Sequence, residues 1–409
     1  MAQVTPAAVQ GTCDPRFELV REEFERNFAE RGETGASVSI TLDGSPVVDL
    51  WGGLADPAAG RPWERDTTVV VWSCSKGATA ICAHVLVSRG ELDLDAPVAR
   101  YWPEFAQNGK EAIPVRMLLN HQSGLAALRQ PLPPGAFYDW ELMTSALAAE
   151  VPFWSPGTRH GYHGLTFGYL VGEVVRRVTG RSLGRFFAEE VAGSLGLDFH
   201  FGLPESEEAR VAPCIPQPPP DPERLTPMER QVFSDPTSVT FLMLANTGGY
   251  MLPGECDSRA AHAAEIPSAG GITNARGLAG LYAPLANGGG ALVDEGSVRR
   301  MAAVSSASGE DATILLPTRF SLGFVKAIDN RRHPAAAGGN NSVILSEEAF
   351  GHSGIGGSIG FAEPAVRLSF GYAMNRHGSG AGLNERGQSL VDAAYRSVGC
   401  ATDAYGTWA

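Results

Sequence analysis

The sequence predicts an α+β fold in which one mainly antiparallel sheet is built from both ends of the chain. Two strand patterns joined by a tight turn lie near the N-terminus, and further strand patterns with a closing helix fill the last third. Helical patterns dominate the middle. We therefore expect a discontinuous α/β region, residues 1–70 and 265–409, interrupted by a mostly helical region at residues 71–264.

The first elements are a helix and a strand pair. Apolar side chains recur on one face of residues 16–31, which is typical of an amphipathic helix. Residues 36–42 and 46–51 are strand patterns, and Asp43-Gly44 between them is a common tight-turn dipeptide. These two strands begin the predicted sheet.

The middle of the chain is predicted to be helical up to a proline-rich segment. Apolar residues recur at helical spacing in residues 73–89, 114–120, 140–150, 165–179 and 182–195. Residues 203–240 hold many prolines, including Pro218, Pro219 and Pro220, and predict a long irregular segment. Because long loops in compact domains often form lids or pocket walls, we expect this segment beside a binding site.

The last third completes the predicted sheet. A helix is expected at residues 275–287, strands at 319–328, 341–346, 356–362 and 366–375, and a final helix near 383–398.

Composition bounds the class of protein. The 409 residues can bury a large core, and 44% hydrophobic with 19% charged residues is typical of an ordinary globular protein. The net charge of −13 argues against a nucleic-acid-binding protein.

Compartment and metal content are predicted from what the chain lacks. The N-terminus shows no signal-peptide pattern, and no run of about 18 apolar residues predicts a membrane span. Six cysteines are scattered without Cys-x-x-Cys pairs, which favours neither a zinc site nor a disulfide framework. We expect a reduced, cytoplasmic protein without a metal or cofactor.

The pattern around which the chain is organised is Ser73-x-x-Lys76 at the start of an apolar helix. Residues i and i+3 meet on one helix face, so the Lys76 amine can reach the Ser73 hydroxyl. A serine nucleophile needs a base, and burial at a helix N-terminus lowers the pKa of a lysine toward the neutral form. Free backbone N–H groups there can hold an oxyanion. The alternative is a serine N-cap followed by a solvated lysine.

Tyr162 is a second candidate, in the loop before the helix at 165–179. A phenol whose pKa is lowered by a neighbouring lysine charge can accept and return a proton. The alternative is a tyrosine packed under the helix with its hydroxyl on a backbone carbonyl.

Residues 351–360 hold a third candidate, His352, among many glycines. So many glycines imply close backbone approach, either by a ligand or by another chain segment. His352 can hydrogen-bond a substrate carbonyl or carboxylate, although a lone histidine in a turn is usually only solvated.

Two further patterns are set aside. Ser358 lies in a Gly-x-Ser-x-Gly match to the nucleophile elbow, but only Glu363 and His377 follow, too close in sequence for that fold. His121, with His160 and His163 further on, shows no metal-ligand spacing and is interpreted as a structural residue at a helix end.

With Ser73-x-x-Lys76, Tyr162-His-Gly and His352-Ser-Gly in that order, the chain resembles the serine β-lactamase and penicillin-binding-protein superfamily. Within it, the chain is most similar to the class C β-lactamase-like, or family VIII, carboxylesterases. The likeness covers most of the chain and extends to residues 118–125, 162–172 and 270–276.

This resemblance implies a fold and a set of roles. The fold is a β-lactamase/DD-peptidase-like antiparallel sheet flanked by helices, with the site in the groove beside a helical region. Ser73 is the implied nucleophile, Lys76 its proton partner and Tyr162 the proton shuttle. The backbone N–H groups of Ser73 and Ile355, the latter on the strand after the third motif, form the implied oxyanion hole. The segment His352, Ser353 and Gly354 then faces the substrate.

Two departures from the family pattern shape the functional prediction. In the resembled family, β-lactamases and peptidases typically carry an asparagine where this chain has Gly164, and a lysine where it has His352. Both losses favour small neutral esters, because neutral histidine is a weak anion anchor.

We therefore predict a serine carboxylesterase that acts on short-chain esters through an acyl-Ser73 intermediate, with no cofactor and a small-molecule ester as its partner. The alternatives are a β-lactamase or D-amino-acid peptidase or amidase using the same residues, and a non-catalytic binding protein that kept the fold. The oligomeric state, and which of Lys76 and Tyr162 is the base, are left open.

Overall fold

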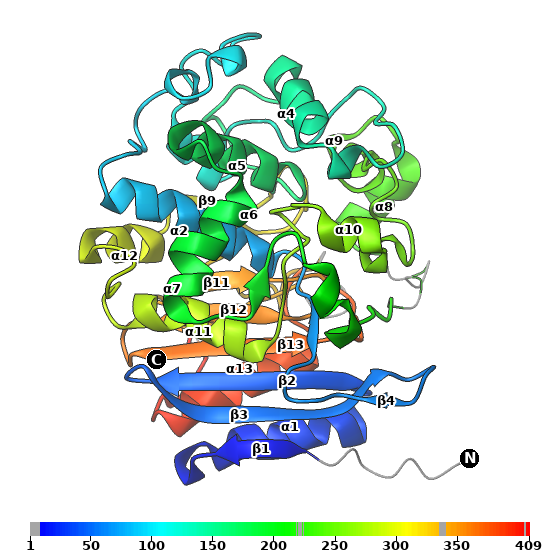
Figure 1. The fold of residues 1–409 in the computed structure, drawn as a ribbon, viewed down its shortest axis with the longest axis vertical. Coiled ribbons are helices and arrows are strands. Elements are labelled where there is room, and N and C mark those ends of the chain that lie inside the picture. Colours follow the sequence, from blue (N-terminus) through cyan, green and yellow to red (C-terminus); the bar gives the residue numbers. More distant parts are fainter. Residues whose placement is uncertain (1–8, 218, 220–222, 224, 335–340, 405) are drawn as a thin grey trace.

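The central sheet takes its strands from both ends of the chain (Figure 1). The computed structural model describes residues 9–217, 219, 223, 225–334, 341–404 and 406–409. The strand order is β1-β3-β2-β13-β12-β11 with antiparallel neighbours throughout, and β4 pairs with β3. The strands are β1 (Gln10–Cys13), β2 (Gly35–Leu42), β3 (Ser45–Asp56), β4 (Arg61–Pro62), β11 (Phe350–Ser353), β12 (Ile359–Glu363) and β13 (Leu368–Met374). The predicted α+β fold with a sheet from both chain ends is confirmed.

The hairpin that starts the sheet forms where the sequence predicts it. Asp43 and Gly44 connect β2 to β3, and both have positive φ, 52° and 77°. This left-handed backbone at both central residues matches the right-handed twist of the strands, which explains the Asp-Gly pair.

Helices cover both faces of the sheet (Figure 1). Helices α1 (Glu18–Glu30) and α13 (Glu385–Ser397) share one buried cluster with the outer face of β2 and β13. Helix α11 (Ala275–Ala286) packs on the other face of β2, β12 and β13. Its approach is close, because a Cβ atom on Gly371 would lie 2.2 Å from the Ala275 carbonyl oxygen. The glycine-rich C-terminal strands therefore serve helix packing.

The helical region surrounds α2 (Cys74–Ser88), which is buried from Cys74 to Leu86. The other α-helices are α3 (Val115–Leu119), α4 (Trp140–Ala149), α5 (Thr166–Thr179), α6 (Leu183–Phe186), α7 (Gly193–Leu195), α8 (Pro227–Ser234), α9 (Val239–Ala245), α10 (Arg259–Ala263) and α12 (Glu295–Ala302). A π-helical turn η5 (Phe187–Ala192) joins α6 to α7, and the 3₁₀ helices are η1 (Pro15–Phe17), η2 (Val98–Arg100), η3 (Pro103–Phe105), η4 (Ala136–Tyr138), η6 (Glu205–Arg210) and η7 (Glu255–Asp257).

Two small sheets lie beside the central one. The first has the order β6-β8-β5-β7, and the second pairs β9 with β10. Their strands are β5 (Thr68–Val70), β6 (Phe199–His200), β7 (Val211–Ala212), β8 (Ile272–Thr273), β9 (Ser306–Ser308) and β10 (Thr318–Phe320). Strand β5 leads directly into the start of α2, so this sheet fixes the position of Ser73.

The proline-rich segment is more regular than predicted. It contains η6, β7 and α8, so the prediction of one irregular segment over 203–240 is wrong for these parts. Helix α8 forms because Thr226 and Glu229 make a capping box and Pro227 occupies the first helical turn. Pro218 and Pro220 lie outside the described residues.

Three of the four strands predicted near the C-terminus need correction, and one further strand was missed. Residues 341–346 form only isolated bridges, and of 319–328 only the first two residues belong to a strand, β10. The predicted strand at 356–362 begins later, at Ile359, and β11 before it was missed because glycine-rich segments carry no strand pattern.

In the parts of the chain that the structure describes, none of the helices is long and apolar enough to cross a bilayer. The division of the chain at 70/71 and 264/265 stays a prediction.

Candidate active site

Ser73 stands at the N-cap of α2, where β5 ends. The residue before it, Trp72, has a φ of 49°, a left-handed conformation that is strained for a bulky side chain. The Trp72 indole is held in place by its N–H, which donates to His377 Nε2 at 3.1 Å. This sharp junction presents Ser73 to a cavity of about 390 Å³ that it lines.

Lys76 reaches back to Ser73 from the first turn of α2. Its Nζ donates to Ser73 Oγ at 2.9 Å and to the Ser268 carbonyl at 3.0 Å. The side chain is fully buried, and this burial lowers the pKa of the amine well below its usual value of 10.5, although the nearby Cys74 opposes the shift. The amine is therefore poised to be neutral, and a neutral amine can accept the Ser73 proton along the same contact.

Tyr162 lies beside both residues. Lys76 Nζ is 4.9 Å from the centre of the Tyr162 ring, and the ring stacks on Phe320. Burial raises the pKa of the Tyr162 phenol above its usual value of 10.0, while a hydrogen bond with Ser73 partly opposes this. The sequence allowed the pKa of this phenol to be lowered by lysine charge; the pKa is instead raised, because burial of the phenol outweighs the opposing hydrogen bond.

Asp311 positions Tyr162 through the backbone. Its buried carboxylate accepts the Tyr162 N–H at 3.0 and 3.1 Å. The same carboxylate accepts the Thr318 hydroxyl at 2.9 Å and the N–H groups of Thr313 and Ile314. One side chain thus ties the tyrosine loop to a cavity wall. The sequence gives no local signal for this contact, since 149 residues separate Tyr162 from Asp311.

His352 lies on β11, at the edge of the central sheet. Its Nδ1 is 2.7 Å from the Ser353 carbonyl oxygen, which can only accept, so Nδ1 carries the hydrogen. Burial lowers the pKa of the ring to about 3, with a smaller contribution from Lys76. The ring is therefore neutral and Nε2 is an acceptor. Donation from Nε2 to a substrate carbonyl or carboxylate, which the sequence allowed, is wrong for this tautomer.

The residues after His352 bring the edge strand against the nucleophile. A Cβ atom on Gly354 would lie 2.3 Å from the Val71 carbonyl oxygen, so only glycine fits here. Ser353 and Ile355 line the cavity with Ser73. Ile355 lies in the turn between β11 and β12 and not on a strand, contrary to the sequence prediction.

The two backbone groups predicted to hold an oxyanion are both available. Among the described residues, neither the Ser73 N–H nor the Ile355 N–H donates to another backbone group, whereas the Gly354 N–H is used by Ser358. Their use as an oxyanion hole stays a prediction.

The cavity is mostly apolar. Its lining includes three methionines, Met228, Met243 and Met251, together with Ile314, Leu316 and Phe320. Gln217, Met228 and Glu229 come from the proline-rich segment, which confirms that this segment forms part of a pocket wall. Met243 also covers Gly164, because a Cβ atom on Gly164 would lie 3.0 Å from the Met243 sulfur.

The patterns that were set aside have structural roles. Ser358 is buried, and its Oγ accepts the Met374 N–H at 3.4 Å. Glu363 accepts the Tyr395 hydroxyl at 2.7 Å and the Ser346 hydroxyl, so it is not the acid of a triad with His377.

The three histidines without metal-ligand spacing, His121, His160 and His163, each have hydrogen-bond partners in the structure. His121 Nδ1 accepts the His163 N–H at 3.1 Å, and the His163 ring contacts Gly161 O and Ser123 Oγ. His160 Nε2 contacts Thr318 Oγ1 at 2.8 Å.

Comparison with known proteins identifies the family. A sequence profile described as Beta-lactamase matches residues 21–395. The chain belongs to the Beta-lactamase family. It is 36% identical to the esterase/beta-lactamase LipL of Mycobacterium tuberculosis over 384 residues, which cover 90% of this chain and 83% of that protein.

Solved structures place the chain within this Beta-lactamase family. The crystal structure of a family VIII carboxylesterase superposes with a TM-score of 0.82 at 38% identity, covering 95% of this chain and 100% of the other. A penicillin-binding protein homologue from Caulobacter crescentus gives a TM-score of 0.79 at 34% identity, with coverage of 95% and 100%. The resemblance predicted from the motifs is confirmed.

Proposed function

We propose that the protein is a serine carboxylesterase that hydrolyses small, short-chain esters through an acyl-Ser73 intermediate. The observation that carries this proposal is a buried Lys76 amine 2.9 Å from Ser73 Oγ, and Ser73 lines a largely apolar cavity. The esterase names of LipL and the family VIII structure support the hydrolase class.

Acylation begins when neutral Lys76 takes the Ser73 proton and Ser73 Oγ attacks the ester carbonyl. The oxyanion binds the N–H groups of Ser73 and Ile355, which lie at the start of α2 and in the turn after β11. Tyr162, neutral because of its raised pKa, donates its proton to the leaving alkoxide and regains one from protonated Lys76. Water attack on the acyl-enzyme reverses these transfers.

Preference for neutral esters follows from the cavity. His352 is uncharged and presents an acceptor, so it offers no anchor for a substrate carboxylate. Gly164 offers no amide side chain, and Met243 occupies the adjacent space. A neutral ester buries apolar surface against this wall without leaving a charge unpaired.

A β-lactamase activity at the same site is the second candidate, and the name of LipL favours it. It uses the same nucleophile and differs only in the substrates that the cavity accepts.

Steady-state kinetics on p-nitrophenyl acetate, butyrate and octanoate and on nitrocefin test the proposal. We expect ester turnover that falls with chain length, exceeds nitrocefin turnover and vanishes in Ser73→Ala. Ser358→Ala is the matched control and should retain activity, since this serine is buried in the Gly-x-Ser-x-Gly pattern that was set aside. Ester turnover that survives in a folded Ser73→Ala variant contradicts the proposal, and nitrocefin as the better substrate selects the second candidate. The cytoplasmic location stays a sequence prediction.

A further inference from the structure

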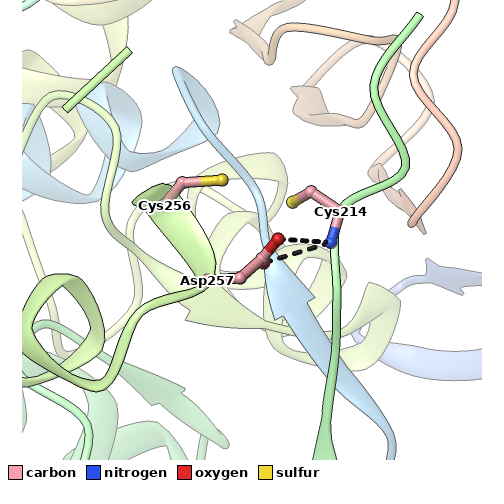
Figure 2. A group of neighbouring side chains, drawn as sticks. All are labelled: Cys214, Cys256 and Asp257. Atoms are coloured by element: carbon pink, nitrogen blue, oxygen red, sulfur yellow. Dashed lines mark hydrogen bonds between the residues drawn. The ribbon is translucent and has the colours of Figure 1, made fainter. Parts of the chain in front are cut away.

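Two cysteines and an aspartate, distant in sequence, meet near the cavity wall (Figure 2). Cys214 follows β7, while Cys256 and Asp257 belong to η7. The two Sγ atoms and a carboxylate oxygen of Asp257 all lie within 4.8 Å of one another. Figure 2 shows the sulfur atoms pointing toward each other, with the carboxylate beside the gap between them. The spacing argument from the sequence missed this group because 42 residues separate the cysteines.

The Asp257 carboxylate lacks a cationic partner. It is partly buried, and it forms no ion pair with any residue that the structure describes. Comparable carboxylates nearby are paired, since Glu208 contacts both Arg259 and His262. Asp257 instead accepts the Cys214 N–H with both oxygens at 3.1 Å. A partly buried carboxylate facing two thiols is an electrostatic arrangement that a cation stabilises.

We propose that Cys214, Cys256 and Asp257 form a binding site for a borderline-soft divalent cation of the zinc class, with water as the fourth ligand. Thiolate sulfur and carboxylate oxygen bind zinc at roughly 2.3 and 2.0–2.2 Å in a tetrahedral arrangement. The three ligand atoms therefore need only a small closure. Soft sulfur ligands favour zinc over magnesium or calcium.

Binding of the cation to the two thiols and the carboxylate involves no change of oxidation state. The hydrated cation keeps one water as its fourth ligand and releases its other waters, each thiol releases one proton to solvent, and two metal–sulfur bonds and one metal–oxygen bond form. The site accepts the cation from solution, because Cys214 and Asp257 are only partly buried.

The cation would fasten two segments of the cavity wall together. Gln217 lies three residues after Cys214 and Met251 five residues before Cys256, and both line the cavity. Tyr250, beside Met251, packs its ring 6.0 Å from that of Trp72, which precedes the nucleophile. The cation is thus structural, and the proposal does not rest on the proposed ester hydrolysis.

The test uses the untagged, full-length protein, reduced and stripped of metal with a chelator. Zinc titration against a chromophoric competitor is expected to show one equivalent per chain and release of up to two protons. Cobalt should give a near-ultraviolet sulfur-to-cobalt absorption band. Cys214→Ser, Cys256→Ser and Asp257→Asn are each expected to lose binding of the zinc equivalent. Cys400→Ser, which changes another partly buried free cysteine, should still bind it.

Failure of the reduced wild type to take up one equivalent, or uptake unchanged in the Cys214→Ser/Cys256→Ser double variant, overturns the proposal. A Cys214–Cys256 disulfide found by mass spectrometry, with no zinc uptake after reduction, also overturns the proposal and assigns the two cysteines to thiol oxidation. Asp257→Asn retains an acceptor for the Cys214 N–H, so it keeps the test valid if a cysteine variant misfolds. Hydrolysis of p-nitrophenyl butyrate, measured in parallel, reports on Ser73 separately.

Discussion

Burial acts in opposite directions on the two proton-carrying groups beside Ser73. It disfavours the ammonium of Lys76 and so lowers its pKa, and it disfavours the phenolate of Tyr162 and so raises that pKa. Both shifts favour the neutral form of their group. This assigns the lysine as acceptor and the tyrosine as donor in our proposal.

The pH dependence of kcat/KM should reflect this assignment. Below the lowered pKa of Lys76 the amine is protonated, so kcat/KM is expected to fall about tenfold per pH unit toward acid. No loss from tyrosine ionisation is expected up to pH 10, because the pKa of Tyr162 lies above that value. A pH–rate profile with p-nitrophenyl butyrate measures both limbs.

Lys76→Arg is the matching variant, since arginine stays charged, and it should lower kcat/KM by about 10²–10⁴-fold at every pH. A profile whose acid limb is unchanged in this variant contradicts the role of Lys76 as base.

Asp311→Asn should lower kcat more than it changes KM. The amide group cannot accept both the Tyr162 N–H and the Thr318 hydroxyl as the carboxylate does, so the phenol shifts from its position. We expect a fall of about 10- to 100-fold in kcat for p-nitrophenyl butyrate. Asp294→Asn, at an N-cap where asparagine serves equally well, is the control. Unchanged kcat in folded Asp311→Asn rules out the positioning role.

Residue-scale prediction succeeded where the contact is local. Ser73 and Lys76 meet because three residues separate them on a helix, which the sequence displays directly. Asp311 and the tautomer of His352 depend on backbone positions set by distant segments. No single-sequence pattern carries that information.

At the scale of elements, the close packing of α11 on the sheet depends on glycine. The sequence left open whether the glycines near His352 admit a ligand or another chain segment. At Gly360 the answer is a chain segment, because a Cβ atom there would lie 2.8 Å from the Tyr282 ring on α11. Gly371 on β13 faces the same helix.

Gly371→Ala tests this packing. The added Cβ would meet the Ala275 carbonyl oxygen at 2.2 Å and the Ala279 nitrogen at 2.7 Å, and neither backbone atom can move freely. We expect a loss of about 1–3 kcal/mol in the free energy of unfolding, seen as a lower Tm by calorimetry. Gly309→Ala, where no atom lies within 4 Å, should change it by less than about 0.5 kcal/mol. Equal Tm values for the two variants contradict the packing argument.

Elements with their own periodic pattern were predictable, among them α1, α2, α5, β2 and β3. Strand β11 was not, because its four residues, Phe350–Ser353, lie next to glycines, and among the described strands they pair with β12 alone. Helix α8 carried its signal in Thr226 and Glu229, but the surrounding prolines obscured it.

At the scale of the whole molecule, the two ends of the chain are fastened by a buried ion pair. Arg386 on α13 donates to Glu33 at 2.6 Å, and Tyr372 on β13 also donates to Glu33. Burial raises the pKa of Glu33, and the nearby Arg386 charge opposes that shift.

Arg386→Met should destabilise the protein by about 3–5 kcal/mol at neutral pH, because it leaves a buried carboxylate unpaired. Without the arginine the pKa of Glu33 rises further above its unfolded value. The variant is then most stable at low pH, where Glu33 is protonated, and its free energy of unfolding falls as the pH rises through the pKa of Glu33. The Tm difference from wild type should therefore be larger at pH 8 than at pH 5.

Arg367→Met is the control, since the side chains of this arginine and its partner Asp43 are each 60% exposed. It should lower the free energy of unfolding by less than about 1 kcal/mol. A pH-independent deficit in Arg386→Met contradicts the assignment to Glu33.

The pairing of β2 with β13 has a consequence for biosynthesis. Residue 42 lies opposite residue 368. The second edge of β2 is therefore covered only after nearly the whole chain has been synthesised. At about 5–20 residues per second, the ribosome takes on the order of tens of seconds to supply that partner. During this interval the β2–β3 hairpin exposes an open, apolar edge that can pair with other nascent chains. Shielding of that edge until translation ends is therefore expected to raise the folding yield in the cell.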